Sequence, residues 1–155
     1  MSETVNFFVN KASAEQIADH LLCCDADFVP PLSDRVNITD YARKITSKAT
    51  RFEGWSGGEL VGLVAAYCND QERRIGYITS VSVLRGWAGK GTASGMLELC
   101  VEHAKARGMR QISLEVASDN APALSLYQKS GFIEGQTNAS SITMNLYFNA
   151  GEEHE

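Results

Sequence analysis

Hydrophobic and polar residues alternate with different periods along the chain, and these periods predict its elements. Residues 5–9 form a short apolar run that is typical of a strand. Apolar residues at helical spacing then predict two helices, one that follows Ser13 as its N-cap and ends near Cys24, and one that follows Thr39. Between them, residues 25–37 contain two consecutive prolines, which predict a loop.

The next stretch has the pattern of a β-meander. Two β-prone runs, residues 50–55 and 60–67, flank Gly57 and Gly58, and this arrangement predicts a hairpin. Residues 75–83 supply a third β-prone run. We therefore expect three consecutive antiparallel strands.

The second half of the chain alternates between helical and β-prone stretches. Its expected elements are a helix over residues 89–107 stopped by Gly108, a strand over 111–117, a helix from Asp119 or Asn120 to about Lys129, and an antiparallel strand pair over 132–137 and 142–148. The predicted fold is an α/β (α+β) domain with a mixed, mainly antiparallel central sheet and helices on both faces. No linker or repeat interrupts the sequence, so we expect a single domain over residues 1–155 with a frayed acidic tail at 150–155.

Composition and charge narrow the function classes. The chain has 155 residues and a net charge of −5, which argues against a general nucleic-acid binder. It has no apolar run long enough to span a bilayer and no basic region before its first apolar stretch, so we expect neither a membrane partner nor a secretory signal. The four cysteines form no C-x-x-C pair, so we expect reduced thiols in the cytoplasm and no metal site.

A glycine-rich turn is the first candidate for chemistry. Residues 88–93 read A-G-K-G-T-A between a predicted strand and a predicted helix, where unpaired amides suit a pyrophosphate. A purely steric role for these glycines fits the same residues. A Walker-type loop does not fit, because Leu84 stands where its first glycine belongs. A dinucleotide fingerprint nearly fits residues 89–94 with Glu115 as its acid, but the chain lacks the repeated βαβ units of that fold.

A second motif follows the next predicted strand. Residues 120–132 read N-x-x-A-x-x-L-Y-x-x-x-G-F, which resembles a signature of the GCN5-related N-acetyltransferase (GNAT) family. In that family the motif is paired with an earlier turn written Q/R-x-x-G-x-G/A, and the glycine turn stands in that place with Ala88 at the Gln or Arg position. The resemblance covers residues 75–132. Arg85 and Lys90 are candidates for the missing charge.

The resemblance implies acetyl-coenzyme A as the co-substrate, bound in the gap of a splayed strand pair formed by residues 75–83 and 111–117. In such a fold, backbone groups of the first strand pair with the pantetheine arm, and the turn amides hold the pyrophosphate. Asn120 reaches the pantetheine from the other side. The implied coenzyme-binding residues are Val81, Ser82, Val83, Ala88, Gly89, Lys90, Gly91, Thr92, Ala93, Ser94, Asn120 and Tyr127.

The resemblance also implies an acid and a base. Tyr127 stands where the family places the proton donor for the leaving thiolate, with a core tyrosine as the alternative. Glu115 lies between two apolar residues of a predicted central strand, where an acid is out of place unless it faces a cleft. It resembles the glutamate that serves as base in members that acetylate peptide α-amines. A chain of ordered waters, as used by other members, and a merely exposed strand glutamate both stay open.

The expected acceptor is a small-molecule or peptide primary amine. Its identity stays open among peptide N-termini, lysine, polyamines, amino sugars and antibiotics. The acidic loop is the candidate for gripping a cationic amine, with a solvated loop as the alternative, and its candidate residues are Asp25, Asp27, Phe28 and Asp34. We expect an N-acetyltransferase that works by direct attack of the amine. The alternative is a module of the same fold that binds acetyl-coenzyme A without turnover, and a homodimer is compatible with either.

Overall fold

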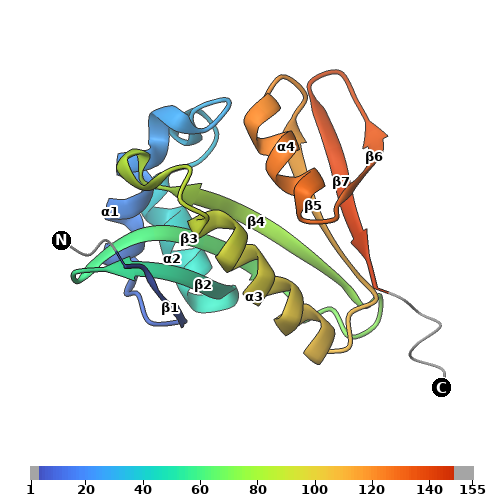
Figure 1. The fold of residues 1–155 in the computed structure, drawn as a ribbon, viewed down its shortest axis with the longest axis horizontal. Helices are drawn as coiled ribbons and strands as arrows, with labels where there is room; N and C mark the ends of the chain where they lie inside the picture. The colour runs from blue at the N-terminus through green and yellow to red at the C-terminus, as the bar shows by residue number, and fades with distance from the viewer. Residues whose placement is uncertain (1–3, 149–155) are drawn as a thin grey trace.

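The computed structural model describes residues 4–148, and its strands form one seven-stranded sheet in the order β1-β2-β3-β4-β5-β7-β6 (Figure 1). The strands are β1 (Asn6–Val9), β2 (Thr50–Ser56), β3 (Glu59–Tyr67), β4 (Ile75–Val83), β5 (Gln111–Ala117), β6 (Ile133–Thr137) and β7 (Ser141–Tyr147). All neighbours are antiparallel except β4 and β5, which run parallel. The sheet is therefore mixed and mainly antiparallel, as expected. The tail at 150–155 lies outside the described residues.

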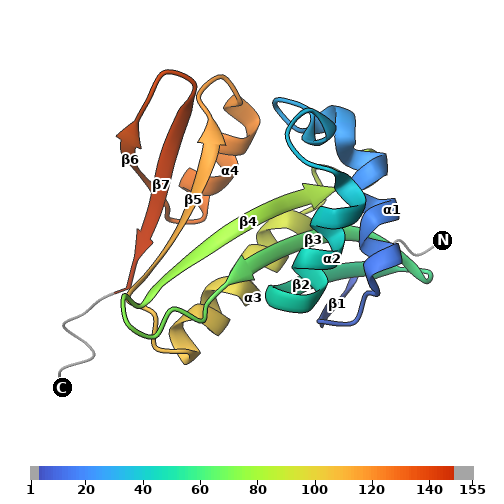
Figure 2. The ribbon, with the colours of Figure 1, turned by 180° about the vertical axis from the view of Figure 1, so that it is seen from behind.

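Helices cover both faces of this sheet. The helices are α1 (Ala14–Cys24), α2 (Ile38–Lys48), α3 (Thr92–Ala106) and α4 (Ala121–Lys129), with short 3-10 turns η1 (Asp25–Asp27), η2 (Leu32–Asp34) and η3 (Arg85–Trp87). Figures 1 and 2 show α1 and α2 on one face of β2–β4 and α3 on the other, with α4 beside β5. The segment that joins α1 to α2 lies across the open end of the sheet from α4.

Strand β3 lies at the centre of the core because both of its faces are buried. Leu63 and Ala65 pack into the cluster under α1 and α2, whereas Val64 and Ala66 pack into the cluster under α3. Successive side chains of a strand point to opposite faces, so a strand covered on both sides has an almost continuous apolar sequence. This explains the run L-V-G-L-V-A-A-Y.

One glycine in that run sets how closely α3 approaches the sheet. A Cβ atom on Gly62 would stand 2.8 Å from Cε of Met96 and 3.0 Å from Cγ2 of Thr92. The first turns of α3 therefore rest directly on β3. This contact positions the start of α3 next to the end of β4.

Strands β4 and β5 separate soon after they pair. Their register pairs are Ile75 with Gln111, Gly76 with Ile112 and Tyr77 with Ser113, and no further pair follows in the described chain. Figure 1 shows the two strands diverging beyond this point, with β5, β7, β6 and α4 leaning away from the rest. The splayed strand pair expected from the sequence is confirmed.

The N-caps predicted from the sequence are correct for α1 and wrong for α2. The cap at Ser13 is confirmed: its hydroxyl accepts from the Gln16 N–H at 3.1 Å, and the Gln16 side chain accepts from the Ser13 N–H at 2.9 Å. The cap predicted at Thr39 is wrong. Asn37 is the N-cap of α2, and its side-chain oxygen accepts from the Asp40 N–H at 3.0 Å.

The predicted start of the long helix is also wrong. Helix α3 begins at Thr92 instead of residue 89. Gly89 and Gly91 have φ angles of 77° and 82°, a left-handed conformation that a right-handed helix cannot continue through. The glycines instead shape a turn that ends at the helix N-terminus. The helix stops before Gly108, which also has a positive φ, as expected.

Candidate active site

A cleft of about 630 Å³ lies where β4 and β5 separate. Four parts of the chain enclose it: the segment between α1 and α2, strand β4, strand β5 with the start of α4, and the turn between β6 and β7. Its lining residues are Asp27, Phe28, Val29, Pro30, Arg35, Thr79, Ser80, Val81, Glu115, Val116, Ala117, Asn120, Ala123, Tyr127, Asn138, Ser140 and Ser141. A smaller cavity of about 150 Å³ adjoins it, lined by Cys24, Asp27, Phe28, Val81, Ser82 and Val83.

The wall of the cleft formed by β4 has an open backbone edge. On its β3 side, Val81 pairs with Val64 and Val83 pairs with Gly62, whereas β5 has already diverged. A register shift leaves Thr79 as an extra residue in β4, since Ala65 pairs with Ser80 and Ala66 with Ile78. Unpaired backbone groups beyond this bulge can form strand-like hydrogen bonds with an amide-containing ligand. The side chains of Val81 and Val83 pack against the core at the same time.

The start of α3 offers unpaired amides. Its N-cap is Gly91, which supplies no side-chain cap, and the first helical donor is the N–H of Gly95, bonded to the Gly91 carbonyl at 3.0 Å. The amides of Thr92, Ala93 and Ser94 precede that donor and have no intrahelical acceptor. Such a helix start binds anions through its amides and its dipole. Ala88 has extended backbone just before this turn.

Tyr127 lies on α4 and lines the cleft, with 8% of its surface exposed. Its ring packs edge-on against Phe132 at a centroid distance of 6.0 Å. Burial raises the pKa of Tyr127 to about 12, so the hydroxyl keeps its proton at neutral pH. Tyr127 is therefore suited to donate a hydrogen bond into the cleft and unsuited to act as a base there.

Glu115 lines the same cleft from β5. It is exposed, while its neighbours Leu114 and Val116 are buried on the opposite face, which agrees with the alternation predicted for this strand. The Ser141 hydroxyl donates to Oε2 of Glu115 at 2.9 Å and holds the carboxylate against β7. One carboxylate oxygen thus has a fixed partner, and the group still faces the cleft that Tyr127 lines.

Asn120 has a structural role beside its expected ligand role. Its side-chain oxygen accepts from the Ala123 N–H at 3.3 Å and caps α4. The residue also lines the cleft. Capping uses the oxygen and leaves the side-chain NH₂ group as a donor for a ligand.

The four acceptor candidates divide into two pairs. Asp27 and Phe28 line the cleft, whereas Asp25 and Asp34 are not among its lining residues. The Asp25 carboxylate accepts from the backbone N–H and the hydroxyl of Ser33, both at 2.7 Å, and these bonds lower its pKa. Asp25 thus stabilises the loop through bonds to another residue of the same loop.

Asp27 forms an ion pair with Arg85. This pairing neutralises much of the negative charge that the loop brings to the cleft. It also engages the arginine that was one candidate for the charge missing at Ala88.

Several cleft residues were missed in the sequence. Arg35 reaches the cleft from the turn after η2, Thr79 and Ser80 from the bulge of β4, and Ser140 and Ser141 from the β6–β7 turn. A bulge and a hairpin turn have no sequence pattern that marks them as ligand contacts. Arg35 belongs to the loop predicted to bind the acceptor, but a cationic amine favours the acids of that loop over its arginine.

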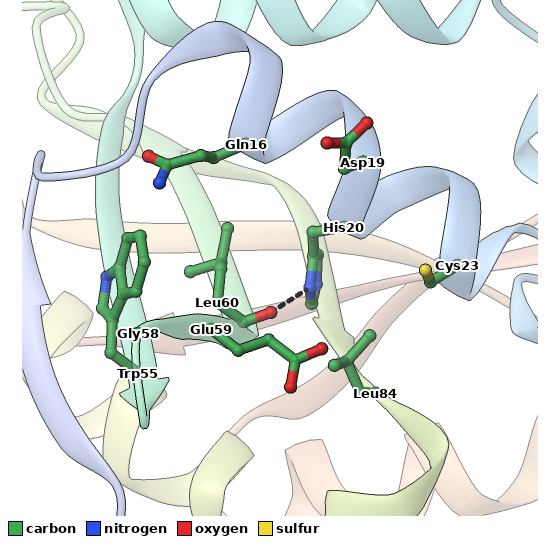
Figure 3. A pocket seen from close by; sticks show the side chains of 9 residues that line it. All are labelled: Gln16, Asp19, His20, Cys23, Trp55, Gly58, Glu59, Leu60 and Leu84. Carbon is green, nitrogen blue, oxygen red and sulfur yellow. Dashed lines mark hydrogen bonds between the residues drawn. The ribbon is translucent and has the colours of Figure 1, made fainter.

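A third cavity, of about 260 Å³, lies between α1 and the β2–β3 hairpin and is lined in part by His20 (Figure 3). His20 is 3% exposed. Its Nδ1 atom is 3.0 Å from the Leu60 carbonyl, and Nε2 is 2.9 Å from Oγ of Ser82. Because a carbonyl only accepts, Nδ1 carries the proton and Nε2 accepts from the Ser82 hydroxyl. This histidine, which is isolated in the sequence and belongs to no motif there, fixes a residue of the β4 wall.

Within residues 4–148, no group of three or more His, Cys, Asp or Glu side chains is arranged to hold a metal ion. None of the helices described here has the length and hydropathy needed to cross a membrane.

Comparison with known proteins adds independent information. Residues 14–132 match the sequence profile of the acetyltransferase (GNAT) family. A stretch of 78 residues, half of this chain, is 32% identical to mycothiol acetyltransferase of Corynebacterium glutamicum strain R, of which it covers 26%. The chain thus spans only part of that curated relative.

Two solved structures are similar over nearly the whole chain. PH1933 from Pyrococcus horikoshii OT3 superposes with a TM-score of 0.76 at 19% identity, covering 94% of this chain and 99% of that one. A Bacillus subtilis acetyltransferase crystallised with CoA superposes with a TM-score of 0.72 at 17% identity, covering 94% and 99%. At such identities the structures establish the fold. Together with the profile match over residues 14–132, they lead to one conclusion: this chain belongs to the acetyltransferase (GNAT) family.

Proposed function

We propose that this protein transfers the acetyl group of acetyl-CoA to a primary amine by direct attack of the amine nitrogen on the thioester. The observation that carries the proposal is the cleft between the splayed strands β4 and β5. It combines the open edge of β4 with Tyr127 and Glu115 on the opposite wall. Family membership and the CoA-bound structural relative support the choice of acetyl-CoA.

The residues present fit the parts of acetyl-CoA. The open edge of Val81–Val83 suits the amide groups of the pantetheine arm, and the side-chain NH₂ of Asn120 faces the same cleft. The amides of Thr92, Ala93 and Ser94 suit a pyrophosphate at the helix start. When bound, acetyl-CoA supplies an acetyl group activated as a thioester.

The acceptor amine must lose a proton before it attacks. Amines with a pKa near 10 are mostly protonated at neutral pH. Glu115 is the carboxylate that faces the cleft without an ion-pair partner among the described residues, so it is our candidate base. Glu115 accepts the proton directly or through one bridging water molecule.

Tyr127 acts on the departing sulfur. An ordinary thiol has a pKa near 8.5, far below that of Tyr127, so full transfer of the tyrosine proton to the thiolate is unfavourable. The hydroxyl instead donates a hydrogen bond that stabilises the thiolate as it leaves. This interaction grows with the negative charge on sulfur and therefore favours the transition state over the ground state.

Ligand binding and turnover together test the proposal. Acetyl-CoA, ATP and NAD are compared for their effect on the melting temperature, since a ligand at one hundred times its dissociation constant stabilises by about 2.7 kcal/mol. We expect a shift with acetyl-CoA and thiol release when primary amines are added. Binding without thiol release for any amine of a broad panel would identify a non-catalytic acetyl-CoA-binding module. A shift with NAD or ATP alone would refute the proposal.

A further inference from the structure

The charged residues that line the cleft are Asp27, Arg35 and Glu115. Asp27 is paired with Arg85, and Glu115 accepts a hydrogen bond from Ser141. Arg35 forms no ion pair within residues 4–148. The cleft therefore presents a guanidinium group that no described carboxylate compensates.

Arg35 and Glu115 line the same cleft, Arg35 from the segment between α1 and α2 and Glu115 from β5. Arg35 follows η2, and its N–H donates to the Leu32 carbonyl at 2.9 Å, which anchors its backbone beside the buried Leu32. Burial raises the pKa of Tyr77, the charge of Glu115 raises it further, and the charge of Arg35 opposes both. Tyr77 on β4 is thus close enough to sense both side chains.

The β4 wall of the cleft is polar near its bulge. The Tyr41 hydroxyl of α2 is bonded to the carbonyl and the hydroxyl of Thr79, each at 2.8 Å, and it also lies beside the Ser80 hydroxyl. The Oγ atom of Ser80 is enclosed by protein, and the residue is 6% exposed. These groups are tied to α2, so the charged groups left to bind a ligand are those of Arg35 and Glu115.

We propose that the acceptor is a small primary amine that carries a carboxylate within a few bonds of its nitrogen, as an amino acid does, and that Arg35 binds this carboxylate. The guanidinium fork matches a carboxylate with two parallel hydrogen bonds. Glu115 then receives the amine, and the apolar surface of Phe28, Val29 and Pro30 receives an apolar side chain. A purely cationic acceptor would leave Arg35 facing like charge. This inference rests on the proposed acetyl transfer and narrows its substrate class.

Matched acceptor sets test the role of the carboxylate. Each set contains an amino acid, its amide and its decarboxylated amine, for example leucine, leucinamide and isoamylamine, assayed by thiol release from acetyl-CoA. We expect kcat/KM for the acid to exceed that for the amide by about tenfold or more, the usual size of one charge-assisted contact. Arg35→Gln should remove this advantage by raising KM for the acid while leaving the amide unchanged. Arg35→Lys should keep part of it, because an ammonium group binds as a point charge.

Arg43→Gln is the matched control. Arg43 is an exposed arginine of α2 that pairs with Asp40 outside the cleft, and its substitution changes the net charge by the same amount. It should leave the preference for acids intact. Calorimetry with acetyl-CoA verifies that each variant is folded and binds the co-substrate.

The outcomes separate the two proposals. Acetylation of amines with no preference for the acids, or a preference that survives Arg35→Gln, would overturn the assignment of Arg35 and leave acetyl transfer standing. Failure to bind acetyl-CoA together with the absence of thiol release would overturn both. A tenfold preference that Arg35→Gln abolishes and Arg43→Gln preserves would establish the carboxylate-bearing acceptor class.

Discussion

The imidazole of His20 on α1 accepts a hydrogen bond from the Ser82 hydroxyl on β4, with 2.9 Å between Nε2 and Oγ. The other ring nitrogen donates to the Leu60 carbonyl on β3 at 3.0 Å. One buried side chain therefore joins a helix to two strands. It also holds the segment Val81–Val83, whose open edge forms a wall of the proposed active site.

This relationship predicts how stability changes with pH. Burial lowers the pKa of His20 below its ordinary 6.5. Below pH about 6.5, His20 is therefore protonated in the unfolded chain while it stays neutral in the folded chain. The contribution of His20 to the free energy of unfolding should thus be constant above pH 6.5. It should fall as the pH decreases towards the folded-state pKa. Urea unfolding at pH 7.5, 6.5 and 5.5 measures it. His20→Asn should lower stability by about 1–3 kcal/mol at pH 7.5 through unsatisfied partners and should show a smaller decrease with pH.

His103→Asn is the comparison variant for the pH dependence of stability. The pKa of His103 is also lowered, by burial and by Arg107, so His103→Asn should reduce the pH dependence in the same direction. It lies on α3 and makes an edge contact with the Phe52 ring, away from Ser82. If parent and His20→Asn lose stability equally between pH 7.5 and 5.5, then His20 is not held neutral in the fold.

Gly91 should be required for coenzyme binding for a reason that differs from simple crowding. A Cβ atom there would meet no atom within 4 Å, but the φ angle of 82° disfavours any L side chain. Gly91→Val should cost about 1–2 kcal/mol of stability or distort the turn, and should weaken acetyl-CoA binding at least tenfold in titration calorimetry.

Gly57→Val provides the matched comparison. Gly57 has a φ angle of 57° and equally open surroundings, but it lies in the β2–β3 turn. This variant should lose similar stability and keep its coenzyme affinity. Unchanged affinity in a folded Gly91→Val protein would refute the proposed pyrophosphate site.

Tyr127→Phe should lower kcat by about 100-fold or more, because removing one hydrogen-bond donor to the charge that develops in the transition state typically costs about 10²–10³-fold. Acetyl-CoA affinity should change little, since the ring and its contact with Phe132 remain. In the parent, the pKa of Tyr127 at about 12 predicts no loss of activity from this group below pH about 10. Tyr147→Phe, on the exposed part of β7, is the control. A Tyr127→Phe enzyme with normal kcat would assign this tyrosine to the core alone.

Glu115→Gln should remove the acidic limb of the pH–rate profile if Glu115 accepts the amine proton directly or through a bound water. Coenzyme affinity should remain, because the Ser141 hydroxyl can still donate to an amide oxygen. Glu134→Gln, an exposed change on β6, controls for charge. An acidic limb that persists in Glu115→Gln would assign it to the amine itself or to another base.

Much of the fold could be predicted because its signals act over a few residues. Ser13 caps α1 through a residue three positions away, and Gly57 and Gly58 close the β2–β3 hairpin. The alternation of Leu114, Glu115 and Val116 placed the glutamate on the face opposite its buried neighbours. Local signals were ambiguous at α2, where both Asn37 and Thr39 can cap. The burial of Ile38 in the core decides for the earlier start.

The order of elements, the glycine turn and the motif at residues 120–132 can be read from the amino-acid sequence, since each depends on neighbours along the chain. Which charges reach the cleft depends instead on how the elements pack in three dimensions. The Asp25 carboxylate is hydrogen-bonded to Ser33, Asp27 pairs with an arginine 58 residues away, and Arg35 lines the cleft without an ion-pair partner among the described residues. His20 and Ser82 are 62 residues apart and meet only because α1 packs on the sheet. Such contacts depend on how whole elements pack together, so no short pattern along the chain predicts them.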